Sequence, residues 1–179
     1  MRLKIERTQR RRRAYEDNLY STAQEKNKIQ GQTMHDLQQI QAYLAAHFPH
    51  AMQKFELHSI QDDYTVLKRH IDPHDLRPGA TVSGPTLMQI ADFAVYVGIL
   101  AHEGLIEAAF TTNLNINFLR RPQAGQAIIA HTKILKAGKT LATGEVSMYS
   151  EGNPDLVAHA VATFALLRAD DVSSETHSG

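Results

Sequence analysis

The chain has 179 residues, of which 42% are hydrophobic, and it carries 19 Lys/Arg, 19 Asp/Glu and no cysteine. This length and composition predict one domain with a real hydrophobic core. The lack of cysteine excludes disulfides, a thiolate nucleophile and a cysteine-based metal site. No apolar run has the pattern of a signal sequence or of a spanning helix, so we expect a cytoplasmic protein.

The charge is unevenly distributed along the chain. Residues 1–33 hold nine Lys/Arg and four Asp/Glu, a net charge of +5, whereas residues 34–179 hold ten and fifteen, a net charge of −5. The run Arg10-Arg11-Arg12-Arg13 allows a basic arm for nucleic acid or an anionic membrane. The acidic remainder argues against a nucleic-acid protein. The alternatives that we favour are a poorly ordered extension or a translation start at Met34.

The hydrophobic pattern predicts a domain over residues 34–168, followed by a frayed polar tail at 169–179. Three- and four-residue recurrence indicates helices, and period-two alternation with short turns indicates antiparallel strands. In chain order we expect a helix at 35–48, strands at 54–60 and 64–71, a helix at about 85–103, and strands at 111–119, 127–135, 141–149 and 156–167. A lone apolar helix must be wrapped by that sheet. The fold class is therefore α+β, with a curled antiparallel sheet around one long central helix and an extra N-terminal helix.

The boundaries of the long helix are marked by individual residues. Pro85 suits the first helical position, because it has no N–H to leave unpaired. Either Gly84 or Ser83 is then the N-cap. Gly104 suits the far end.

Asp92 is the main functional clue in this helix. From Leu87 to Leu100 the helix is apolar on every side, and only Gln89 and Asp92 interrupt it. Such a helix belongs in an interior, where an ionised carboxylate is costly unless it is paired or hydrogen-bonded. Asp92 is therefore either a structural carboxylate at an interface or a general base or nucleophile in a cleft.

The strand at 111–119 has two chemically different faces. Hydrophobic side chains occupy one face and asparagines the other: Leu114, Ile116 and Phe118 against Asn113, Asn115 and Asn117. This alternation predicts a strand with one face that is wet or that pairs with another sheet.

The ordered set of elements resembles the hotdog-fold thioesterases, and specifically the phenylacetyl-CoA thioesterase-like (PaaI-like) family. Gly84 and Asp92 keep the family's eight-residue spacing between a glycine and an acidic residue. Similar segments are Ile90-Ala91-Asp92-Phe93-Ala94 at the helix centre, Asn115-Ile116-Asn117-Phe118-Leu119-Arg120-Arg121-Pro122 in a strand, and Ala137-Gly138-Lys139-Thr140-Leu141 in a hairpin. The resemblance covers about residues 55–167. Ser83 replaces the family histidine, and Arg77 stands near the position of a family asparagine.

The resemblance implies hydrolysis of an acyl- or aryl-acyl-CoA thioester. Asp92 would be the base or nucleophile, Gly84 the oxyanion donor, and Thr111 or its neighbour Thr112 would position the water. The implied substrate-binding residues are Ser83, Gln89, Arg77, Arg120 and Arg121, with the last two near the coenzyme A phosphates. Coenzyme A enters only as part of the substrate, and we expect no cofactor and no metal, since the ten histidines show no paired metal-ligand spacing.

The spacing along the helix also predicts an oligomer. Asp92 lies about 12 Å beyond Gly84 at 1.5 Å per residue, which is too far for one carbonyl to touch both. We therefore expect a homodimer or homotetramer with a two-chain site. The competing hypotheses are a non-catalytic hotdog domain that binds acyl-CoA or only assembles, and a hotdog dehydratase, whose histidine the sequence does not place.

Overall fold

The computed structural model describes residues 36–61, 64–106, 108–122 and 124–167. The predicted basic extension, residues 1–33, and the predicted polar tail, residues 169–179, lie outside these described residues. The helices are α2 (Leu37–His47), α3 (Pro49–Met52) and α4 (Gly84–Glu103), with a 3-10 turn η1 (Pro73–Asp75). The strands are β1 (Phe55–Gln61), β2 (Tyr64–Arg69), β3 (Leu76–Arg77), β4 (Thr81–Val82), β5 (Ala108–Phe118), β6 (Ile128–Ala137), β7 (Leu141–Ser150) and β8 (Leu156–Leu167).

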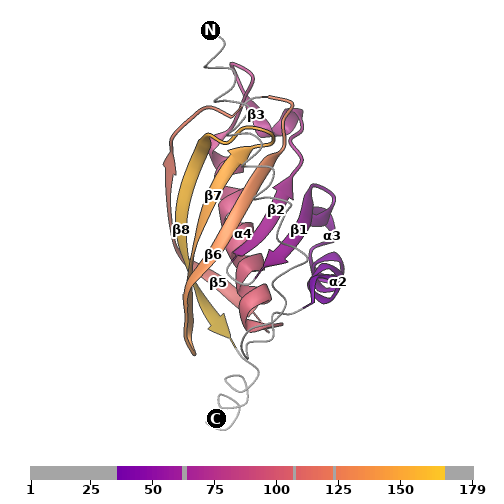
Figure 1. Cartoon of the computed structure of the whole chain (residues 1–179), viewed down its shortest axis with the longest axis vertical. Coiled ribbons are helices and arrows are strands. Elements are labelled where there is room, and N and C mark those ends of the chain that lie inside the picture. The colour runs from indigo at the N-terminus through magenta and orange to yellow at the C-terminus, as the bar shows by residue number, and fades with distance from the viewer. Residues whose placement is uncertain (1–35, 62–63, 107, 123, 168–179) are drawn as a thin grey trace, which may run out of the picture.

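One antiparallel sheet wraps around α4, as the sequence predicted. Six strands of the described chain follow the order β1-β2-β6-β7-β8-β5, and β3 and β4 form a separate two-stranded ribbon. Figure 1 shows α4 against one face of the curved sheet, with α2 and α3 beside β1 and with β5 at the opposite edge. β5 follows α4 in the chain but pairs with β8, so α4 carries the chain from one side of the sheet to the other.

α4 packs closely on the sheet because glycines lie on both sides of the contact, Gly98 on α4 and Gly144 on β7. A Cβ at Gly98 would lie 2.8 Å from Thr132 Cγ2, and a Cβ at Gly144 would lie 3.0 Å from Val95 Cγ1. A Cβ at Gly98 would come closer than real Cβ atoms do, and a Cβ at Gly144 would be tighter than most real contacts, so glycine at both positions lets the helix rest closely on β6 and β7.

The prediction that α4 is buried on every side is wrong for one stripe of its surface. Pro85, Met88 and Gln89 are exposed and Asp92 is half-buried, and these residues recur at helical spacing on one face. Met88 retains 41% of its accessible surface. Asp92 contacts the edge strand β5 through Thr111, and the described residues leave the rest of the stripe open.

The prediction that no apolar run has the pattern of a membrane-spanning helix also needs correction. α4 has 20 residues and by length and composition is able to cross a bilayer. The surroundings of α4 argue against a membrane span, because 67% of the most apolar part of the helix is buried within the fold. α4 therefore serves as the core helix of the domain.

The N-terminal helix differs slightly from the prediction at its end. α2 starts after Asp36, whose side chain accepts a 3.2 Å hydrogen bond from Gln38 N. Pro49 ends α2 but also begins the short helix α3, where proline at the first position has the required φ. Phe48, between the two helices, packs edge-on against Tyr96 of α4 with 5.4 Å between ring centroids. This contact joins the N-terminal helices to the core helix.

Candidate active site

The N-terminus of α4 is capped by Ser83, which settles the choice between Ser83 and Gly84. Ser83 Oγ accepts a hydrogen bond of 3.2 Å from Thr86 N and lies 2.8 Å from Thr86 Oγ1. Ser83 O accepts from Leu87 N at 3.1 Å. Since the first N–H groups of a helix have no partner within it and Pro85 has no N–H, the Gly84 N–H is the remaining donor of this turn. A donor at a helix N-terminus suits a developing negative charge.

The described chain gives no packing reason for glycine at position 84. A Cβ there would meet the nearest atom, Phe118 Cζ, at 3.5 Å, which is an ordinary van der Waals contact. The backbone is not left-handed at this residue either. Alanine would fit and would favour the helix. The missing side chain therefore leaves space beside the free N–H, and a ligand is what we expect to use it.

Asp92 meets a hydroxyl from the edge strand. Thr111 Oγ1 donates a hydrogen bond of 2.6 Å to Asp92 Oδ1. The neighbouring Thr112 occupies a bulge in the β5–β8 ladder, and its hydroxyl donates to Thr163 O at 3.0 Å. Of the two threonines considered in the sequence, only Thr111 thus reaches the carboxylate. One oxygen of Asp92 is held by this bond, and the other has capacity to accept a proton from a water molecule.

The two halves of the candidate site lie at different points along α4. Gly84 lies beside Phe118 at one end of β5, and Asp92 lies beside Thr111 toward the other end. The rise of the helix separates Gly84 from Asp92 by about 12 Å. A small carbonyl cannot contact both within one chain, so the two groups form two separate candidate half-sites.

The remaining predicted substrate-binding residues are all exposed. Gln89 is exposed on α4, Arg77 is exposed on β3, and Arg121 is exposed after β5. Arg120 instead contacts the β7–β8 connection, where its Nη1 donates to Leu156 O at 3.0 Å and its Nε lies 3.9 Å from Asp155 Oδ2. Arg120 therefore has a structural partner as well as an exposed position.

Two features of the site were missed in the sequence. The first is Phe118, whose ring tip covers one side of Gly84 although 52% of its surface is exposed. The alternation in the sequence placed Phe118 on the hydrophobic face of β5, but it did not show that Phe118 lies beside Gly84.

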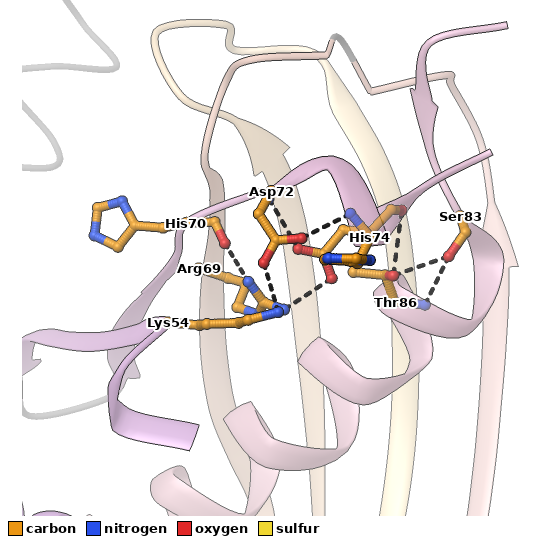
Figure 2. A network of polar contacts seen from close by, with 8 residues as sticks. Lys54, Arg69, His70, Asp72, His74, Ser83 and Thr86 are labelled. Atoms are coloured by element: carbon orange, nitrogen blue, oxygen red, sulfur yellow. Dashed lines mark hydrogen bonds and ion pairs between the residues drawn. The ribbon is translucent and has the colours of Figure 1, made fainter. Parts of the chain in front are cut away.

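The second missed feature is a polar network that leads from β2 to the start of α4 (Figure 2). Its centre is an ion pair of 2.9 Å between Arg69 Nη2 and Asp75 Oδ1, and both side chains are buried. Alternation in β2 places Arg69 on the same inward face as Leu67, and that signal could have found it.

The described residues contain no cluster of three His, Cys, Asp or Glu able to hold a metal ion.

Residues 79–157 match the family model described as the Thioesterase superfamily. A protein of Silicibacter sp. TM1040 described as a thioesterase is 34% identical, with a TM-score of 0.70, over 77% of this chain and 96% of that one. The E. coli PaaI protein of the phenylacetic acid degradation operon is 18% identical, with a TM-score of 0.64, over 73% and 92% of the two chains. A Streptococcus pneumoniae thioesterase protein solved with coenzyme A is 16% identical, with a TM-score of 0.57, over 65% and 90%. None of the curated protein sequences compared matches the chain.

Proposed function

The chain belongs to the thioesterase superfamily and is a thioester hydrolase, and we propose that it is a PaaI-like member that cleaves acyl-CoA at a site shared by two copies. The single observation that carries the two-copy site is the separation of the Asp92–Thr111 pair from the Gly84 N–H along α4. One copy supplies the carboxylate and the other supplies the oxyanion donor. The minimum assembly is a homodimer.

Hydrolysis then follows from the chemistry of the two half-sites. Asp92 either takes a proton from water as the water attacks the thioester carbonyl carbon, or attacks that carbon itself. Thr111 orients the carboxylate by donating to Oδ1. The Gly84 N–H of the other copy stabilises the negative charge on the carbonyl oxygen. Collapse of this intermediate breaks the C–S bond, and the thiolate takes up a proton, from Asp92 on the water route or from solvent on the direct route, to leave as the coenzyme A thiol. On the water route the second product is the free acid. On the direct route an anhydride between the acyl group and Asp92 forms first, and water hydrolyses it to the free acid and the Asp92 carboxylate.

The substrate-binding roles extend this proposal. Gln89 on the open stripe and the exposed residues Arg77, Arg120 and Arg121 are available for the polar parts of coenzyme A. The Ser83 hydroxyl caps α4. In its proposed substrate-binding role, Ser83 would contact the thioester and keep this capping bond. Coenzyme A bound to the S. pneumoniae protein supports this class of substrate. We propose that the enzyme works in the cytoplasm without cofactor or metal.

A thiol-release assay over a panel of acyl-CoAs, including aryl-acyl-CoAs, tests the proposal. Wild-type protein should release coenzyme A from at least one member, and Asp92→Asn should release it more slowly by about 10² or more. Light scattering at micromolar concentration should report a dimer or tetramer, and a monomer would remove the basis of the shared site. Acyl-CoA binding without turnover across the panel would favour a non-catalytic binding domain instead.

A further inference from the structure

The Arg69–Asp75 pair lies inside the fold, although ionised groups are rarely buried. Arg69 retains 2% of its accessible surface and Asp75 retains 6%. The guanidinium also lies 5.1 Å from the centroid of the Phe55 ring and donates to His70 O through Nη1. A buried pair of this kind contributes little net stability, because desolvation offsets the attraction between the charges. Its presence therefore points to a role in fixing geometry.

The pair holds the short turn η1 in place. Asp75 Oδ1 accepts from Arg69 Nη2, and Asp75 Oδ2 accepts from Asp72 N at 3.0 Å. Both carboxylate oxygens are thus used, one by the strand β2 and one by the backbone of the turn. The position of Asp75 relative to the sheet is set by these two bonds.

The backbone of Asp75 in turn holds the start of α4. Asp75 O accepts from Ser83 N at 2.8 Å and from Thr86 Oγ1 at 3.3 Å. These donors flank Gly84 on both sides in the sequence. Figure 2 shows the continuous path of these contacts from Arg69 to the first turn of the helix.

We infer that Asp75 is a positioning residue that fixes the Gly84 N–H for catalysis, through its own carbonyl and through the buried partner Arg69. This inference rests on the proposed role of Gly84 as the oxyanion donor. Misplacing such a donor by about 1 Å costs up to about 10²-fold in rate. Because the donor acts on charge that develops in the transition state, the loss should fall on kcat and leave KM nearly unchanged.

The test compares Asp75→Asn and Thr86→Val with a matched control, Asp72→Asn, in the full-length protein. Asp72 lies in the same turn and pairs with Lys54 at 2.6 Å, but that pair is partly exposed. Thr86→Val removes the hydroxyl that bonds Asp75 O and also contacts Ser83 Oγ, and it leaves the ion pair intact, so it covers the case in which Asp75→Asn fails to fold. Activity is measured at a temperature where circular dichroism shows every variant folded.

The expected result is a fall in kcat of about 10-fold or more for Asp75→Asn and a smaller fall for Thr86→Val, with KM within about 3-fold of the wild type. Asp72→Asn should keep the wild-type kcat. In Asp75→Asn, the Ser83 amide should exchange its hydrogen faster than in the wild type, whereas exchange in the strands of the sheet should be unchanged. Unchanged kcat in both test variants, with the wild type active, would overturn the positioning role alone. An inactive wild type would overturn the proposed function, and unchanged exchange at Ser83 would then also reject the positioning geometry.

Discussion

Thr111 Oγ1 donates a 2.6 Å hydrogen bond to Asp92 Oδ1, so the edge strand β5 and the core helix α4 meet at the proposed catalytic carboxylate. This bond holds one carboxylate oxygen against β5. β5 is an edge strand, which pairs with β8 on one side and with no described strand on the other. The bond therefore limits the orientations of the carboxylate, which we propose acts together with the Gly84 N–H of a second copy.

Replacing Thr111 by valine should slow hydrolysis while the fold is kept. A hydrogen bond to a charged group contributes about 1.5–3 kcal/mol, so kcat should fall by about 10- to 10²-fold. Thr112→Val is the matched control, because it removes a hydroxyl one residue away that bonds only Thr163 O among the described residues. Steady-state kinetics of both variants checks the prediction, and equal losses in the two would argue against a specific role for Thr111.

Asp92→Asn should separate a catalytic from a structural carboxylate. The amide oxygen can still accept from Thr111, but it cannot act as a base, so hydrolysis should fall by about 10² or more. The melting temperature should stay the same or rise, since a half-buried charge has been removed. Both quantities are measured on one sample. An active but destabilised variant would mean that Asp92 is structural.

Gly84→Ala should reduce activity without harming the fold. The new Cβ would lie 3.5 Å from Phe118 Cζ, which the structure tolerates, but it would occupy the space beside the free N–H. We expect a fall in kcat/KM of about 10-fold or more, because part of the oxyanion stabilisation is lost. Thermal unfolding and kinetics together check this.

Gly98→Ala provides the opposite control on the same helix. Its Cβ would lie 2.8 Å from Thr132 Cγ2, so this variant should lose about 1–3 kcal/mol of stability through overpacking. A Gly84→Ala protein that melts as early as Gly98→Ala would show that Gly84 is needed for packing instead.

His131 should make the protein less stable in mild acid. Burial lowers the pKa of His131 from its usual value of 6.5, so the unfolded chain binds a proton that the folded chain does not. Stability is therefore highest above pH 6.5 and decreases as the pH falls below it, down to the folded-state pKa. His131→Phe keeps a ring beside Tyr64, where the centroids are 5.6 Å apart, and should flatten this part of the profile. Denaturant unfolding at pH 5 and pH 8 checks the change, and an unaltered difference between the two would contradict it.

Local chemistry in the sequence was sufficient to predict the elements and their order. Pro85 and Gly104 marked the ends of α4, and period-two alternation marked β5 through β8, because these signals depend on near neighbours in the chain. The spacing of Gly84 and Asp92 is also a property of a single helix, so the separation of the two half-sites followed from the sequence alone.

Only the tertiary structure decided which side chains from different elements meet. Whether Thr111 or Thr112 reaches Asp92 depends on a bulge in the β5–β8 ladder, since one extra residue reverses which face a side chain occupies. The open stripe of α4 depends on the incomplete cover by β5, and the Arg69–Asp75 pair depends on a turn folding back onto β2. These contacts join residues through space, and no local rule of helix or strand formation specifies them.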